Sequence, residues 1–246
     1  MTIRSQADLD GMRRVGRVVR AALEEMRRNV APGVSTEELD LVCTRTFDIH
    51  GARAAPALVY GFPGTACISV NNEAVHGIPG PRRLEPGDLV KLDVTAELDG
   101  YFADAAITVP VPPVSPDRLR LVSCARDALR KATAAATAGR LVNVIGKSVQ
   151  SEVERLGFSI MPALGGHGVG RTIHEAPSVH NYYAPSDDEP LTAGLVLAIE
   201  PVISAGSGMS GDAGDGWTVV TADGADSAHF EHTVVITRGR PLVLTA

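Results

Sequence analysis

The chain repeats one structural plan in its two halves, and this repeat limits its fold more than any other feature of the sequence. In each half an amphipathic helical pattern ends at a glycine, and a second helical pattern ends at another glycine. Gly139 and Gly157 follow Gly33 and Gly51 at the same separation of 106 residues. The four predicted helices span about residues 5–30, 35–51, 117–137 and 143–157.

A pair of matching segments after the helix pairs indicates the same repeat. LEPGDLVKLD (84–93) and LTAGLVLAIE (191–200) correspond at an offset of 107 residues. Each reads Leu-x-x-Gly, then an apolar run typical of a strand, then a carboxylate six residues after the glycine. We therefore expect an α/β (α+β) fold in one domain, 1–246, with half-repeats of about 1–113 and 114–246.

The composition is that of a globular protein and argues against several kinds of partner. A chain of 246 residues with 44% hydrophobic content can bury a sizeable core, and its net charge of -6 argues against a nucleic-acid-binding surface. It has neither an apolar leader nor a run of about 18 apolar residues, so no membrane span is expected. Three cysteines without C-x-x-C spacing predict no disulfide framework or zinc knuckle. Reduced thiols suit the cytoplasm, where we expect the protein to act.

Residues 89–109 are typical of a β-hairpin that brings two aspartates together. The Asp-Gly pair at 99–100 predicts a two-residue turn, which places Asp93 opposite Ala106. Asp104 lies two residues from Ala106 and therefore on the same face as Asp93. Such diagonal neighbours are roughly 7–8 Å apart at the backbone, so their carboxylates can share cations. Without a cation they would repel each other, and one would have a raised pKa.

The glycine-rich stretch GGHGVGRTIHEAP (165–177) contributes histidines, and its form excludes two common motifs. It lacks G-x-x-x-x-G-K and is therefore no nucleotide loop, and His174-Glu175 is followed by Ala-Pro instead of leading to a second histidine one helical turn later. Four carboxylates and one imidazole favour a pair of divalent ions over a thiolate-bound zinc. The candidate ligands are Asp93, Asp104, His167, Glu200 and Glu231.

Six short segments spread along the chain form an ordered set. They are VHGIPG (75–80), KLDVTAELDGYFADA (91–105), GGHGVGRTIHEAP (165–177), IEP (199–201), DGWTV (215–219) and FEHTVV (230–235). The set resembles, in order and over nearly the whole chain, the motifs of the type I methionine aminopeptidases. This resemblance implies the pita-bread fold, in which two pseudo-twofold-related halves form a curved antiparallel sheet covered by helices.

The resemblance also implies a role for each candidate ligand. Asp104 and Glu231 would bridge two divalent ions, Asp93 would chelate one of them, and His167 with Glu200 would bind the other. The ions would be Co, Mn, Fe, Zn or Mg, and the oxygen-rich ligand set does not select among them. A hydroxide held between the ions would attack the scissile carbonyl, with Glu200 as the proton shuttle.

Two further histidines and a pocket follow from the same resemblance. His76 and His174 would contact the substrate, one near the peptide nitrogen and the other near the scissile carbonyl and its oxyanion. Relatives often have aromatic side chains where Val59 and Ile173 stand, an amide in place of His229 and a hydroxyl residue in place of Ala105. The implied methionine pocket consists of Val59, Phe62, Cys67, Ile173, Trp217 and His229.

Three alternative functions remain beside this one. Proline-specific aminopeptidases and dipeptidases share the fold and the ligands but usually carry an N-terminal domain, for which we expect no room here. Type II methionine aminopeptidases insert a helical subdomain between the second histidine and the IEP glutamate, whereas only 26 residues separate His174 from Glu200. A non-catalytic peptide-binding module would be expected to have lost ligands, and none is missing.

The resemblance predicts the substrate and the partners. The enzyme would remove the initiator methionine from nascent or newly made polypeptides with a small second residue. It would be a cytoplasmic monomer with no nucleic-acid site, and a transient contact with the ribosome would use its globular surface.

Overall fold

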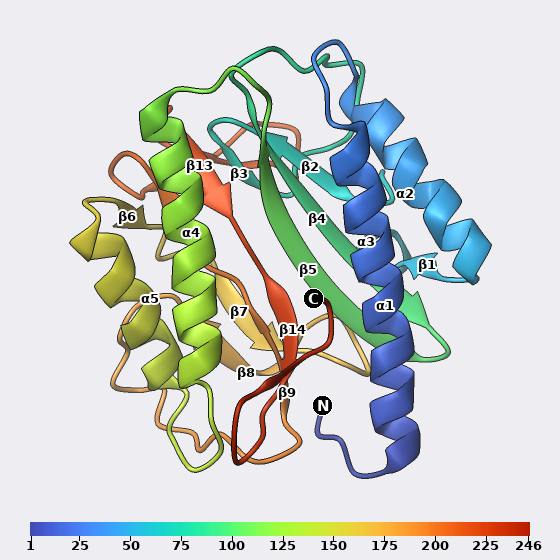
Figure 1. The fold of residues 1–246 in the computed structure, drawn as a ribbon, viewed down its shortest axis with the longest axis vertical. Helices are drawn as coiled ribbons and strands as arrows, with labels where there is room; N and C mark the ends of the chain where they lie inside the picture. The colour runs from blue at the N-terminus through green and yellow to red at the C-terminus, as the bar shows by residue number, and fades with distance from the viewer.

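Two pairs of helices flank a curved set of strands in the computed structural model, which describes all 246 residues (Figure 1). The first pair is α1 (Gln6–Asn29) and α2 (Thr36–His50), and the second is α4 (Pro116–Ala135) and α5 (Asn143–Arg155). All four lie where the sequence predicted them, to within two residues at each end. The short helix α3 (Ala55–Tyr60) was not predicted, and its first turn contains a proline.

The strands are short except for one long hairpin. They are β1 (Arg53–Ala54), β2 (Cys67–Val70), β3 (Glu73–Val75), β4 (Leu89–Leu98), β5 (Tyr101–Pro110), β6 (Ser159–Ile160), β7 (Gly165–Gly168), β8 (Glu175–His180), β9 (Val196–Ile199), β10 (Val202–Ser204), β11 (Ser210–Asp212), β12 (Val219–Thr221), β13 (Ser227–His229), β14 (His232–Val235) and β15 (Leu242–Val243). All of their pairings are antiparallel.

The long hairpin β4–β5 has the predicted register. Leu98 pairs with Tyr101, and Asp93 pairs with Ala106. Asp99 and Gly100 both have positive φ, 53° and 77°, as the tight turn requires. β4 also pairs with β1 and β2, while a second sheet runs in the order β15-β14-β9-β7-β8.

Hydrogen bonds between β5 and the start of β14 join the two sheets. The backbone N–H of Glu231 donates to the carbonyl of Ala106 at 2.9 Å. The Thr233 hydroxyl accepts from the Asp104 N–H and donates to the Asp104 carbonyl, both at 2.8 Å. This joint lies in the centre of Figure 1 and fixes the separation of the strands that carry Asp104 and Glu231.

Each helix pair covers its own apolar core. α1 packs on β4 and β5, and a cluster of 30 buried apolar residues lies beneath the first pair. α4 and α5 cover a second cluster of 21 buried residues. The division into half-repeats of about 1–113 and 114–246 stays a prediction, and the two clusters accord with it.

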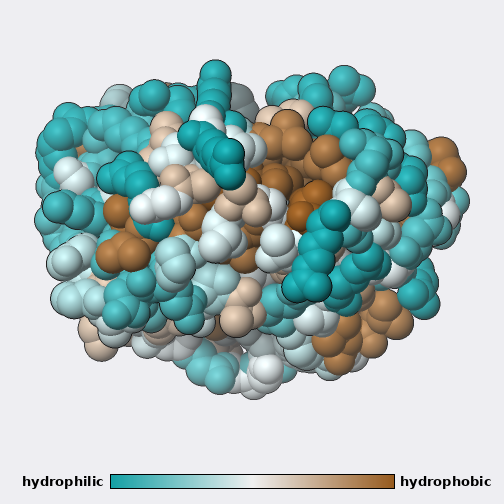
Figure 2. All heavy atoms as spheres, turned by 90° about the horizontal axis from the view of Figure 1, so that it is seen from below, coloured by the Kyte–Doolittle hydropathy of each residue, from teal (hydrophilic) through white to brown (hydrophobic).

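The outer surface is mostly polar. Figure 2 shows the face below the view of Figure 1, where hydrophilic residues predominate and hydrophobic ones appear mainly in a hollow and at a few edges. None of the helices combines the length and the apolar character needed to cross a bilayer.

We predict that Gly146→Ala destabilises the fold although it lies inside α5. Alanine in a helix interior is ordinarily favoured over glycine by about 1 kcal/mol. A Cβ at this position would lie 2.1 Å from the carbonyl oxygen of Tyr182 and 2.5 Å from that of His180, so the helix would have to move away from β8. We expect the free energy of unfolding in urea to fall by about 1–3 kcal/mol.

Lys147→Ala is the matched control, because Lys147 is exposed on the same helix. It should change the free energy of unfolding by less than about 0.5 kcal/mol. A Gly146→Ala protein as stable as the parent would contradict the close packing of α5 on β8.

Candidate active site

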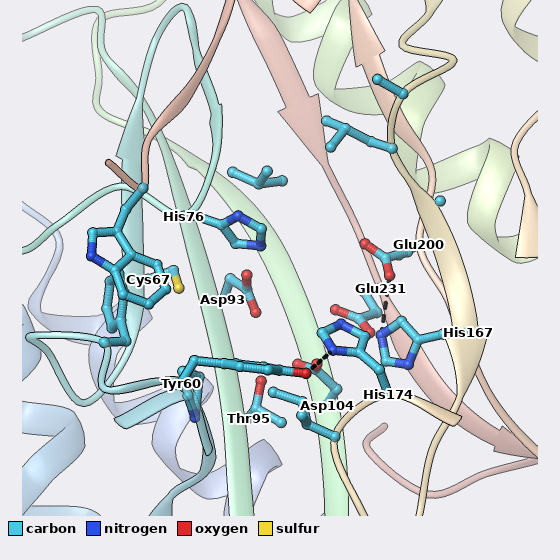
Figure 3. A pocket seen from close by; sticks show the side chains of 18 residues that line it. Tyr60, Cys67, His76, Asp93, Thr95, Asp104, His167, His174, Glu200 and Glu231 are labelled. Carbon is cyan, nitrogen blue, oxygen red and sulfur yellow. Dashed lines mark hydrogen bonds and ion pairs between the residues drawn. The ribbon is translucent and has the colours of Figure 1, made fainter. Parts of the chain in front are cut away.

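One cavity, of about 210 Å³, brings together the predicted ligands and most of the predicted substrate-contacting residues (Figure 3). Asp93 and Asp104 come from the paired strands β4 and β5. His167 lies on β7, Glu200 directly follows β9, and Glu231 directly precedes β14. The remaining predicted residues in the wall are His76, His174, Phe62, Cys67, Ile173 and Trp217.

The four carboxyl groups lie in a setting that disfavours their charged forms. Burial raises the pKa of Asp104 from its ordinary 3.8 to about 7. Burial and then the charge of Asp104 raise the pKa of Asp93 well above its usual range. The same two causes, in the same order, raise the pKa values of Glu200 and Glu231. These groups can be charged together only if cations offset their repulsion.

Two buried carboxylate oxygens have no hydrogen-bond partner within the protein. They are Oδ1 of Asp104 and Oε1 of Glu231, and both residues line the cavity. Asp104, His167 and Glu231 each offer a ligand atom, and these atoms lie within 4.8 Å of one another. Unpartnered carboxylate oxygens converging with an imidazole have the chemistry of a divalent metal site, so the residues present fit such an ion.

His167 is held in a neutral form that would suit a metal ligand. Its Nδ1 lies 2.9 Å from the carbonyl of Gly168, which fixes the ring with the Nδ1 proton donated and the Nε2 lone pair free. Nε2 lies 3.4 Å from Oε1 of Glu200. Burial lowers the pKa of His167 to about 4, so the ring is neutral at physiological pH.

His76 is held in a strained backbone conformation. Its φ of 58° is unusual for a residue with a side chain and is typical of functional positions. Gly77 follows, and a Cβ there would lie 2.3 Å from the carbonyl oxygen of Ile68, so only glycine fits. The hydroxyls of Ser69 and Thr218 bond the backbone of Gly77 and His76 at 2.9 Å and 3.4 Å.

His174 lies at the mouth of the cavity. Its ring meets that of His167 edge to face, with the centroids 4.2 Å apart. Its Nδ1 lies 2.6 Å from the hydroxyl of Tyr60. The two histidines of the glycine-rich stretch therefore contact each other, one deep in the site and the other near its entrance.

The apolar wall is formed by four of the six predicted pocket residues. Phe62 and Trp217 pack edge to face with the centroids 5.2 Å apart. Burial raises the pKa of the Cys67 thiol well above its usual range, so Cys67 stays protonated and acts as a small apolar side chain. A cavity with this wall accepts a narrow apolar side chain beside the carboxyl cluster.

The structure places the other two predicted pocket residues outside the cavity wall. Val59 lies on α3 outside the wall, and its neighbour Tyr60 lines the cavity instead. His229 is buried behind the wall, with Nε2 3.6 Å from Glu200 and 3.9 Å from Glu231 and with neither ring nitrogen hydrogen-bonded. Successive residues of a helix point in different directions, which separates Val59 from Tyr60.

Seven residues of the wall were not predicted from the sequence: Pro56, Tyr60, Val75, Thr95, Ala163, Leu164 and Gly165. Thr95 pairs with Asp104 across the hairpin. Strand alternation could have identified it, since it lies two residues after Asp93 on the same face. No comparable signal identified Tyr60, because its role depends on how α3 packs.

Comparison with known proteins agrees with this geometry. The model of metallopeptidase family M24 matches residues 10–238. The chain belongs to this family. Methionine aminopeptidase 2 of Bacillus subtilis is 42% identical over 247 residues, covering 100% of this chain and 99% of the relative. Methionine aminopeptidase of Clostridium perfringens is 39% identical, covering 99% and 98%.

Two solved structures of methionine aminopeptidases superpose closely on this chain. Methionine aminopeptidase from Rickettsia prowazekii superposes with a TM-score of 0.95 at 34% identity, covering 100% of both chains. Methionine aminopeptidase from Thermotoga maritima superposes with a TM-score of 0.96 at 35% identity, covering 100% of this chain and 99% of the other. The expected pita-bread fold is thereby confirmed. As an M24 metallopeptidase, the chain is a hydrolase of a family that uses divalent metal.

A more distant likeness concerns the fold alone. Prolidase from Pyrococcus furiosus superposes with a TM-score of 0.80 at 21% identity, and this chain covers 65% of it.

We predict that divalent metal stabilises the protein more strongly as the pH rises. The pKa of Asp104 is about 7 in the metal-free fold, against 3.8 ordinarily. Between these values the folded state holds a proton that the unfolded state has released, so the free energy of unfolding of the metal-free protein falls as the pH rises. A cation that replaces this proton prevents this fall in the free energy of unfolding.

Differential scanning calorimetry of metal-loaded and metal-stripped protein measures this effect. The Tm difference between the two forms should be larger at pH 8 than at pH 5. A difference that stays constant or shrinks with rising pH would show that the carboxyl cluster does not bind the metal.

Proposed function

We propose that this chain is a type I methionine aminopeptidase that removes the N-terminal methionine from polypeptides with a small second residue. The convergence of five ligand side chains beside an apolar cavity carries the proposal. The type I assignment is supported by the short connection of 26 residues from His174 to Glu200, which leaves no space for a helical subdomain.

The proposed site holds two divalent cations drawn from Co, Mn, Fe, Zn and Mg. Asp104 and Glu231 would bridge them, Asp93 would complete one site, and His167 with Glu200 would complete the other. When bound, the cations supply an activated water and polarise the scissile carbonyl. The protein's own contribution is to gather the carboxylates and to exclude competing hydrogen-bond donors from Asp104 and Glu231.

The remaining steps are assigned to side chains around the cations. Glu200 takes a proton from the attacking water and passes it to the departing amine, a task that a carboxylate within hydrogen-bond reach of that water can perform. His174 donates to the oxyanion of the tetrahedral intermediate, and His76 contacts the peptide nitrogen. The free α-amine of the substrate lies against the carboxylates, which restricts cleavage to the first residue of a chain.

The methionine side chain occupies the apolar end of the cavity. Phe62 and Trp217 form its aromatic wall, and thioether contact with such rings is favourable. The natural substrates in this proposal are nascent or newly made chains in the cytoplasm. The enzyme acts as a monomer, and any ribosome contact is transient.

The test is methionine release from Met-Ala-Ser and Met-Leu-Ser peptides. We expect release from Met-Ala-Ser, loss of activity after metal removal and recovery after metal is returned. Met-Leu-Ser should be cleaved poorly, because its second residue is large. Cleavage of an Xaa-Pro peptide with Met-Ala-Ser untouched would instead identify a proline-specific peptidase, and metal-independent binding without turnover would identify a binding module.

Asp104→Asn and Asp99→Asn form a matched pair of variants for this assay. Both lie in the β4–β5 hairpin, but Asp104 lines the cavity and Asp99 lies in the exposed turn. We expect Asp104→Asn to lose at least about a hundredfold in kcat, and Asp99→Asn to retain the parent rate. Full activity of Asp104→Asn would overturn the proposed metal site.

A further inference from the structure

The hydroxyl of Tyr60 bonds His174 across the mouth of the cavity. The distance from the Tyr60 hydroxyl to His174 Nδ1 is 2.6 Å, and the ring centroids are 5.7 Å apart at an interplanar angle of 37°. Figure 3 shows the contact as a dashed line between two side chains that both line the cavity. Tyr60 ends α3, whereas His174 lies 114 residues later, directly before β8.

The chemistry of the two groups determines the direction of this hydrogen bond. Above about pH 7.5 a tyrosine phenol and a histidine imidazole are both largely neutral, because their ordinary pKa values are about 10 and 6.5. A neutral phenol carries one proton, and a neutral imidazole carries one proton and one lone pair. The Tyr60 hydroxyl makes no other hydrogen bond within the protein, so we assign its proton to the bond with Nδ1 of His174.

The ring of His167 lies edge to face against that of His174, with the centroids 4.2 Å apart. A neutral ring whose Nδ1 accepts a hydrogen bond must carry its proton on Nε2.

We propose that Tyr60 is a positioning residue that fixes His174 in the tautomer with the proton on Nε2. This tautomer gives His174 an N–H donor for the substrate oxyanion, while Nδ1 is occupied by Tyr60. The inference rests on the role of His174 in the proposed function. It adds a residue of α3 that none of the sequence motifs contains.

The tautomer can be measured directly by nitrogen NMR. Protein labelled with 15N-histidine and loaded with diamagnetic Zn²⁺ gives long-range proton–nitrogen correlations that distinguish a protonated ring nitrogen from an unprotonated one. The His174 signals are assigned by their absence from a His174→Asn sample. In the parent we expect Nδ1 unprotonated and hydrogen-bonded, and Nε2 protonated.

Tyr60→Phe keeps the ring over the mouth and removes only the hydroxyl. We expect its Nδ1 resonance to lose the hydrogen-bond shift and the two tautomers to become mixed. With Met-Ala-Ser, kcat should fall about three- to tenfold, as for the loss of one hydrogen bond, while KM changes less than about twofold. Leu58→Ala, on the exposed side of the same helix and away from the cavity, is the control and should match the parent in both readouts.

Two results would overturn the proposal. One is a parent spectrum with His174 protonated on Nδ1, and the other is a Tyr60→Phe protein with unchanged His174 nitrogen signals and unchanged kcat. A parent that sets the tautomer as expected but releases no methionine would instead contradict the proposed function, because the NMR readout requires no turnover.

Discussion

Repulsion among four buried carboxyl groups is the constraint on which the rest of the structure depends. Asp93, Asp104, Glu200 and Glu231 share one cavity, and burial raises the pKa of each. Removing these carboxylates from water costs free energy. The fold can retain the cluster because bound cations offset that desolvation cost. The unpartnered oxygens of Asp104 and Glu231 show where such compensation is needed. Membership of a metallopeptidase family accords with this requirement.

The fold meets the constraint by placing each carboxylate on a strand or directly next to one. The β4–β5 hairpin carries two of them, and the backbone bond from Glu231 to Ala106 aligns a third with that hairpin. The helix pairs cover the two apolar cores and leave the inner side of the strands for the site. Strain is confined to places such as His76, where Gly77 and neighbouring hydroxyls fix an unusual backbone conformation.

Local signals were sufficient to predict much of this architecture. Gly51 marked the end of α2, and the Asp-Gly turn set the register that pairs Asp93 with Ala106. The contacts between the halves depend on tertiary packing, and the sequence suggested them only through the repeat and the resemblance. The side chains at the mouth were harder to predict, because the six-residue helix α3 places Tyr60 in the cavity wall and Val59 outside it. His229 illustrates the same limit, since a motif position does not reveal that its ring lies behind the cavity wall.

The central claim is that the buried carboxylates and His167 are gathered around two cations. An anomalous-difference map from crystals of the Mn²⁺-loaded protein tests it most directly. The account predicts two peaks about 3.5–4 Å apart, with ligands supplied by Asp93, Asp104, His167, Glu200 and Glu231. A map in which manganese is absent from this cavity, or is held there without Asp104 and Glu231, would contradict it.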